Sequence, residues 1–111
     1  MFEMKLGEIM KVRGVLFKHK DDAAERVSFG TKYKITKFLF DTDSEACFCD
    51  KSMKEIEEQC QEKNAEYMTK IEELLSTEVD KNVQFTAEEL EHFALSVEDL
   101  ICLYGCITEE L

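Results

Sequence analysis

The histidines and cysteines are the residues of this chain best suited to acid–base or nucleophilic chemistry. His19 and His92 are each candidates for a general base near neutral pH, and Cys60 with His92 would be the simplest nucleophilic pair. Neither histidine lies in a recognisable catalytic motif. The four glycines are far apart, so there is no glycine-rich phosphate-binding loop. We therefore expect that the protein is not an enzyme.

The cysteines also raise the question of a metal site. Cys102 and Cys106 are one helical turn apart, which keeps zinc binding open as an alternative. However, a helical Cys-x-Cys such as Cys47 and Cys49 directs its two side chains roughly 200° apart, whereas structural zinc pairs close a turn. The five cysteines are an odd number, and the first residues lack a secretory signal. We expect reduced, mostly buried thiols with no metal and no cofactor.

Three acidic residues near the middle of the chain resemble the first ligands of an EF-hand calcium loop. They are Asp41, Asp43 and Glu45. The rest of the pattern fails, because Ala46 stands where the loop needs glycine and Ser52 stands where the bidentate glutamate belongs. Calcium binding is therefore not expected.

A long helix is the element around which the rest of the chain is expected to pack. Its apolar and small residues recur in steps of four and three, the period of a helix with one buried seam. No proline occurs in the chain. At 1.5 Å per residue, the stretch from Ile35 to Glu62 would be a rod of roughly 40 Å. The seam consists of Ile35, Leu39, Thr42, Ala46, Cys49, Met53, Ile56 and Cys60.

The period breaks at Lys63 and Asn64, where we expect a bend, with Asn64 capping or ending a helix. Whether the helix continues through the break to Leu75 or a second helix begins there is left open. The middle of the long helix is apolar on more than one side, with Phe40 and Phe48 outside the seam. Such a helix either lies at the centre of its domain or is half covered by a second copy, which makes a homodimer a further expectation.

Short elements are predicted on either side of the long helix. Alternation predicts a strand over residues 2–6, and a helix should follow over residues 8–18, then a turn over residues 19–26. Ser28 is the preferred cap of the long helix, ahead of Thr31.

After the long helix, residues 78–85 should form a strand that pairs with residues 2–6. Capping motifs at residues 86–89 and 96–99 should each begin a short helix. The expected fold is therefore one domain, residues 1–111, of the α+β class and mostly α. It has a long central helix, shorter packed helices and a small two-stranded antiparallel sheet.

The charge is unevenly distributed along the chain. Residues 1–40 contain nine Lys or Arg and five Asp or Glu, a net charge of +4. Residues 41–111 contain five basic and twenty acidic residues, a net charge of −15, and the sum is the formal −11. This acidity disfavours direct binding to nucleic acid or to an anionic membrane, and it suits a basic protein surface such as a nucleic-acid groove. The plainer alternative is that acidic helices serve solubility.

Two further features concern location and the start of the long helix. No run of about eighteen apolar residues is present, so we expect no membrane span and a cytoplasmic location.

Lys32, Lys34 and Lys37 put positive charge at the positive end of the helix dipole. Either these lysines serve a function, or they are solvated or neutralised by acidic helices nearby.

Four segments carry a resemblance to a known group of proteins. They are Met4-Lys5-Leu6-Gly7-Glu8-Ile9, Ser28-Phe29-x-x-Lys32-Tyr33-Lys34-Ile35-x-Lys37-Phe38-Leu39, the stretch from Glu72 to Val79, and Leu95-Ser96-x-x-Asp99-Leu100-x-x-Leu103. Through these segments the chain resembles, over nearly its whole length, small proteins of unknown function encoded in phages and prophages of Gram-positive bacteria. It departs from them in its cysteines and at Phe48-Cys49. The resemblance implies a phage origin and assigns no functional residue.

That origin suggests three classes of function. Small, acidic, non-enzymatic phage proteins resemble inhibitors of host defence, including anti-CRISPR proteins, which often occupy the basic nucleic-acid channel of a nuclease. The expected partner is then a host protein with a basic surface, such as a CRISPR effector, in the cytoplasm of the bacterial host. The alternatives are a phage morphogenesis component that self-associates through the long helix and an accessory regulator of host transcription or replication. The candidate partner-binding residues are Glu55, Glu58, Glu62, Glu66, Glu73 and Asp80.

Overall fold

Helices make up most of this protein, as predicted. The computed structural model describes residues 4–22, 25–60, 62 and 64–108, and the molecule measures 47 × 28 × 25 Å along its principal axes. The elements, in chain order, are β1 (Met4–Lys5), α1 (Leu6–His19), α2 (Phe29–Asp41), α3 (Asp43–Gln59), α4 (Ala65–Leu75), β2 (Glu78–Val79), β3 (Phe85–Thr86), α5 (Ala87–Leu90), α6 (Val97–Leu103), a 3₁₀ turn (Tyr104–Cys106) and β4 (Ile107–Thr108).

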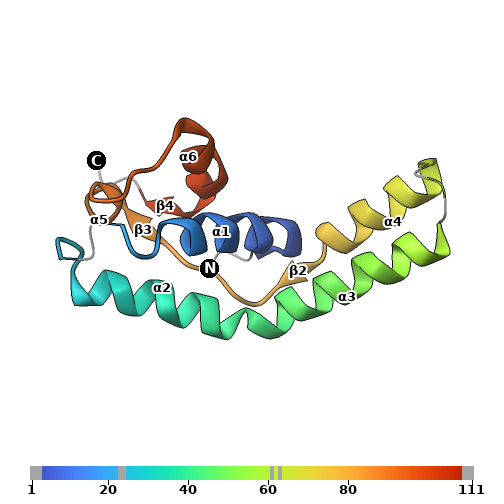
Figure 1. Ribbon diagram of the computed structural model, residues 1–111, viewed down its shortest axis with the longest axis horizontal. Helices are drawn as coiled ribbons and strands as arrows, with labels where there is room; N and C mark the ends of the chain where they lie inside the picture. Colours follow the sequence, from blue (N-terminus) through green and yellow to red (C-terminus); the bar gives the residue numbers. More distant parts are fainter. Residues whose placement is uncertain (1–3, 23–24, 61, 63, 109–111) are drawn as a thin grey trace.

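The long central helix needs a correction, because it is divided at Thr42 into α2 and α3. Thr42 leaves helical geometry with φ −103° and ψ 8°, and its hydroxyl donates to the Phe38 carbonyl at 2.7 Å. A threonine hydroxyl bonded back to the preceding turn commonly bends a helix. Backbone hydrogen bonds still span the junction, from Thr42 to Phe38 and from Ala46 to Thr42, each 3.0 Å long. The two helices therefore stay nearly in line as one gently bent rod (Figure 1).

The predicted seam of this rod is confirmed. Ile35, Thr42, Ala46 and Cys49 are buried, and the other four seam residues are half-buried. The rod begins at Phe29, as the predicted Ser28 cap implies, and α3 ends at Gln59 rather than at residue 62.

A second helix follows the predicted break. The Asn64 side chain accepts a hydrogen bond from the Tyr67 amide at 3.1 Å, so Asn64 is the N-cap of α4. Helix α4 returns alongside α3, and the two helices form an arm that extends away from the rest of the molecule (Figure 1). Lys63, the other residue of the predicted break, lies outside the described residues.

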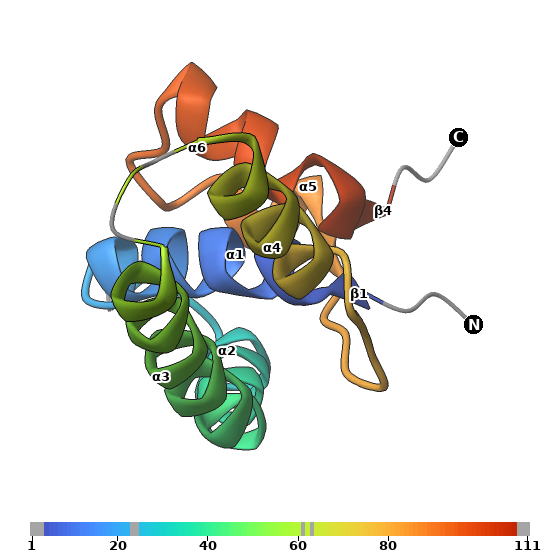
Figure 2. The same cartoon turned by 90° about the vertical axis from the view of Figure 1, so that its right-hand side faces the viewer.

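The core forms around α1, which packs against α3, α4 and α6. Figure 2 shows α1 running between the α2–α3 rod on one side and α4 with α6 on the other. Helix α1 begins at Leu6, two residues before the predicted start. Its side chains Ile9, Val12 and Leu16 are buried in the same cluster as Phe38 of α2, and the cluster also contains Met4, Phe85, Leu103 and Cys106.

The strands are shorter than predicted. The expected antiparallel pair is present, with Met4 opposite Val79 and Lys5 opposite Glu78, whereas the start of the predicted strand, residues 2–3, lies outside the described residues. The strand predicted over residues 78–85 is wrong in its middle, because residues 80–84 are irregular. Its last residue belongs instead to β3, which pairs in parallel with β4 and places Phe85 opposite Ile107.

The predicted caps are confirmed. Ser28 accepts from the Thr31 amide at 3.2 Å, and Thr86 and Ser96 each form a capping box with the acidic residue three positions later. Helix α5 is short, as expected, and consists of a single turn that ends at Leu90. These side chains fix where each helix starts.

Two glycines of α1 give opposite predictions for substitution by alanine. A Cβ at Gly7 would lie 3.1 Å from the Leu75 Cβ and 3.2 Å from the Leu75 carbonyl oxygen, whereas a Cβ at Gly14 would meet nothing within 4 Å. We expect Gly14→Ala to stabilise the protein by up to about 1 kcal/mol, since alanine favours the helix. Gly7→Ala should destabilise it by about 1 kcal/mol, because α1 and α4 must move apart. Urea unfolding of both variants measures the difference, and equal effects would contradict the close approach.

Candidate protein-binding surface

The six predicted partner-binding carboxylates are all exposed. Glu55 and Glu58 lie on α3, Glu62 lies in the turn, and Glu66 and Glu73 lie on α4. The sixth, Asp80, follows β2. Because the apolar seams of α3 and α4 face inward, the carboxylates of the two helices lie on two sides of the hairpin rather than forming one patch.

Three more exposed acidic residues accompany the predicted six. They are Glu57, Glu72 and Glu78, which the sequence reasoning did not select although they share the same helical pattern. The stretch from residue 55 to residue 80, here called the acidic arm, therefore contains nine acidic residues and two lysines, a net charge of −7. Lys70, the lysine of this stretch that the structure describes, is half-buried and engaged by Glu66 at 3.5 Å and by the Gln59 amide oxygen at 3.2 Å.

A buried arginine fixes the junction between the body and the rod that carries the arm. The Arg13 Nη1 atom donates to the Leu39 carbonyl at 2.6 Å and to the Thr42 hydroxyl at 2.7 Å. Its Nη2 atom lies 3.7 Å from an Asp43 carboxylate oxygen, and its guanidinium carbon lies 5.3 Å from the centre of the Phe17 ring. The guanidinium thus satisfies a carbonyl at the bend in the rod and ties α1 to the start of α3.

A second tie joins the rod to the return from the arm. The Lys81 ammonium donates to the Asp41 carbonyl at 3.1 Å and lies 3.7 Å from a Glu45 carboxylate oxygen. Both partners flank the bend at Thr42. The rod is therefore held at its bend from two sides, by α1 and by the segment that follows the acidic arm.

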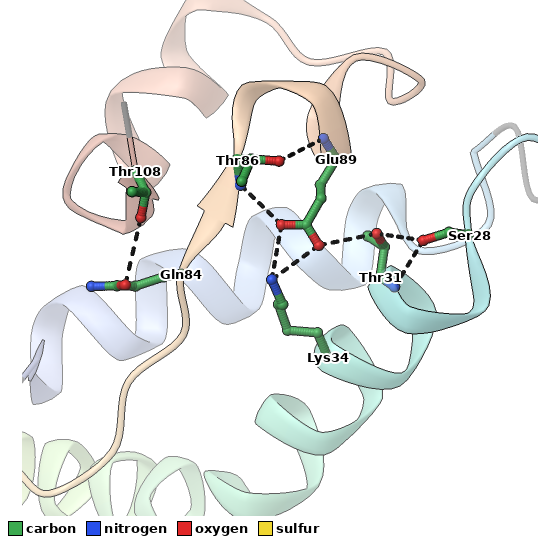
Figure 3. A network of polar contacts seen from close by, with 7 residues as sticks. All are labelled: Ser28, Thr31, Lys34, Gln84, Thr86, Glu89 and Thr108. Atoms are coloured by element: carbon green, nitrogen blue, oxygen red, sulfur yellow. Dashed lines mark hydrogen bonds and ion pairs between the residues drawn. The ribbon is translucent and has the colours of Figure 1, made fainter. Parts of the chain in front are cut away.

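Figure 3 shows how the start of α2 is tied to α5. The Lys34 ammonium donates to both Glu89 carboxylate oxygens, at 2.8 and 2.9 Å, and the Thr31 hydroxyl donates to the same carboxylate at 3.2 Å. Burial raises the pKa of Glu89, but the contacts with Lys34, Thr86 and Thr31 outweigh burial and lower it. Lys37 is paired with Asp41 at 3.0 Å, so two of the three lysines that begin the rod are neutralised by acidic neighbours.

His19 is enclosed by two carboxylates. Its Nδ1 lies 2.6 Å from an Asp22 oxygen and its Nε2 lies 2.7 Å from an Asp99 oxygen. The hydrogen bond with Asp22 raises the pKa of His19 and burial lowers it, while the hydrogen bond with Asp99 adds to the rise. The net effect is a raised pKa. The Ser96 amide and His19 lower the pKa of Asp99 to about 2. Both ring nitrogens are occupied, so this group joins α1 to the cap of α6 and leaves no nitrogen for a substrate.

The other chemical candidates are not assembled into a site. Figure 1 places α5 and the end of α3 at opposite ends of the molecule, so His92, just after α5, does not face Cys60. Burial raises the pKa of the thiols of Cys49 and Cys106, the latter to about 11. The expectation of mostly buried cysteines holds only in part, because Cys49 and Cys106 are buried whereas Cys60 and Cys102 are half-buried and Cys47 is exposed.

Across residues 4–22, 25–60, 62 and 64–108, no cluster of three or more His, Cys, Asp or Glu residues has the arrangement needed to hold a metal ion. Within the same described residues, no helix combines the length and apolar character needed to cross a membrane.

Comparison of the chain with protein-family models, with curated proteins and with solved structures finds no match.

Proposed function

We propose that this protein is an acidic binding module that inhibits a host protein by occupying its basic, nucleic-acid-binding surface. The observation that carries the proposal is the acidic arm, which projects from the body with a net charge of −7 on exposed carboxylates. In the form that the resemblance favours, the protein is phage-encoded, acts in the cytoplasm of a bacterial host and blocks a defence protein such as a CRISPR effector.

The shape of the arm supports this kind of binding. A helix with its side chains is about 10–12 Å wide, so a hairpin of two helices is a narrow rod. Proteins that bind single strands use a positively charged groove that follows the phosphate backbone. A rod with carboxylates on two sides presents negative charge to both walls of such a groove, and the complementary charge also speeds association. The contacts of Arg13 and Lys81 hold the rod that carries the arm at its bend, so little conformational freedom is lost on binding.

A triple substitution on α4 and just after β2 tests the proposal. Glu66→Gln, Glu73→Gln and Asp80→Asn together remove three exposed charges, each worth roughly 0.5 kcal/mol at an interface, so we expect about a tenfold loss of affinity. The immobilised protein is exposed to host lysate, the retained protein is identified, and its affinity for both forms is measured at low and high salt.

The matched control removes three exposed carboxylates outside the arm, with Glu88→Gln, Glu91→Gln and Glu98→Gln. This variant has the same net charge as the arm variant. It should bind within about twofold of the original protein, because its changes lie away from the arm. Equal losses in both variants would show that only total charge matters and would contradict the proposal.

A second candidate function is that of a structural component that self-associates. The observation that favours it is a row of exposed aromatic side chains on α2, opposite the buried face of that helix. Self-association through this row should not weaken as salt rises, because salt does not screen the burial of apolar surface. Binding of a partner through the acidic arm should weaken as salt rises.

A further inference from the structure

Helix α2 exposes a row of aromatic side chains to solvent. Phe29 and Phe40 are each 82% exposed, and Tyr33 is 58% exposed. At about 100° per residue, these three residues point within roughly 40° of one another. The buried residues Ile35 and Phe38 point in the opposite direction, into the core. Helix α2 therefore has two apolar faces, and only one of them is covered within the chain.

The outer face extends beyond α2. Phe48 of α3 is 56% exposed, and Phe17 of α1, which is 50% exposed, borders with Phe40 an open groove of about 540 Å³. Single exposed apolar residues are ordinary on a protein surface, but aligned aromatic residues form a continuous patch. Tyr and Phe are also the residue types enriched at interface centres. We call the side chains of Phe29, Tyr33, Phe40 and Phe48 the aromatic face.

Charge runs in opposite senses at the two ends of the rod. The first two turns of α2 carry Lys32 and Lys34 and no acidic residue, and Lys32 is exposed beside the aromatic face. The last five residues of α3 carry Glu55, Glu57 and Glu58 and no basic residue, whereas Lys51 and Lys54 are exposed one turn earlier. A second rod laid antiparallel on the first would bring the lysine of each copy to the glutamates of the other. A parallel arrangement would put like charges together.

We propose that the aromatic face binds a second copy of this chain, with the two α2–α3 rods antiparallel. The two-fold axis crosses the rod near Ser44, so that Phe40 of each copy packs near Phe48 of the other. Lys32 of each copy then lies near Glu55 and Glu58 of the other. A two-fold arrangement of this kind uses the same surface on both copies and closes at a dimer.

The available area suits a stable dimer. Stable interfaces bury roughly 800 Å² on each partner, and a buried Phe or Tyr contributes about 150–250 Å². At their observed exposures, the four residues of the aromatic face would supply roughly 500 Å² per copy. The remaining area comes from the rest of the rod, which follows most of the 47 Å long axis (Figure 1).

This inference goes beyond the proposed function and does not depend on it. The dimer would use Glu55 and Glu58, whereas Glu66 and Glu73 on α4 would stay available to a partner. Loss of the dimer and loss of partner binding are therefore separable in experiment.

Light scattering of the purified protein at about 100 µM and at low and high salt tests the dimer. We expect twice the chain mass of 12.9 kDa in both conditions, and Phe29→Ser with Phe40→Ser should weaken association at least 100-fold. Because both side chains are exposed, the double variant should keep the helical circular dichroism of the original. The matched control combines Ile101→Ser on the exposed side of α6 with Tyr104→Ser in the 3₁₀ turn that follows, and it should remain dimeric.

A charge exchange tests the antiparallel arrangement. Lys32→Glu alone, and Glu55→Lys with Glu58→Lys, should each weaken the dimer, whereas all three changes in one chain should restore it. In a parallel dimer the combination would bring no rescue. A monomeric original protein, a dimer lost only through the α6 variant, or an absence of rescue would each overturn the proposal.

Discussion

Replacing Arg13 with alanine is expected to lower the free energy of unfolding by about 3 kcal/mol, because truncating a buried, hydrogen-bonded charge leaves its partners unsatisfied. The lost contacts are those with the Leu39 carbonyl and the Thr42 hydroxyl, both at the bend between α2 and α3. For a chain of this size the midpoint of thermal unfolding should fall by roughly 15 °C. Thermal and urea unfolding followed by circular dichroism measure both quantities.

Two further variants separate the role of the guanidinium from that of charge alone. Lys11→Ala on the exposed side of α1 should change stability by less than about 0.5 kcal/mol. Arg13→Lys keeps the charge but loses the planar fork, so it should recover only part of the loss. If Arg13→Ala were as mild as Lys11→Ala, the arginine would not be what holds the rod against α1.

Protonation of His19 is expected to give the protein a stability maximum on the acidic side of neutral pH. The pKa of His19 is raised from 6.5 in the folded protein, so its contribution is complete below pH 6.5 and is lost as pH rises through the folded value. The pKa of Asp99 is lowered from 3.8 to about 2, so its contribution is present above pH 3.8 and is lost as pH falls towards 2. Asp22, whose pKa is also lowered, acts in the same direction as Asp99. Stability should therefore be greatest between about pH 4 and pH 6.5.

Urea unfolding across pH 3–9 measures this profile, with one variant and one control. His19→Gln should remove the decline above pH 6.5 and destabilise the protein at pH 6, where the imidazole is charged. His92→Gln, at an exposed histidine, should leave the profile unchanged. An unaltered decline in His19→Gln would show that another group causes it.

The features of the fold that could be predicted from the sequence are those set by neighbouring residues. The seam from Ile35 to Cys60 depends on helical period, and the caps at Ser28 and Ser96 depend on residues three positions apart. Both depend only on residues close together in the chain, so the sequence alone predicts them. The bend at Thr42 was missed because threonine fits a seam in size, while its hydroxyl bonding to Phe38 depends on the helix already being formed.

Apart from the pairing of β1 with β2, contacts between distant parts of the chain were not predictable. Arg13 lies on the buried side of α1, and that position was the one available signal, but its partners Leu39 and Thr42 are 26 and 29 residues away. His19 and Asp99 are 80 residues apart. The β3–β4 pair has two residues in each strand, too few for any alternation to appear.

For the candidate site, the sequence identified the carboxylates but not their arrangement. Glu55 and Glu73 were selected from charge alone, and their placement on the two sides of a hairpin follows from the return of α4 along α3. The sequence left open whether the wide apolar face of the long helix is covered within the domain. Because Phe40 and Phe48 are exposed, part of that face is not covered within the chain. Helix α2 is covered by the core on one side only, as Phe29 and Tyr33 also show.

Displacement of nucleic acid from the retained host protein is the measurement that tests the central claim most directly. A fluorescently labelled nucleic acid bound to that host protein is titrated with this protein, with its triple arm variant and with the matched control variant. The account predicts release of the nucleic acid by the original and the control, about tenfold weaker release by the arm variant, and weaker release by all as salt rises. Tight binding to the host protein without any release of nucleic acid would contradict it.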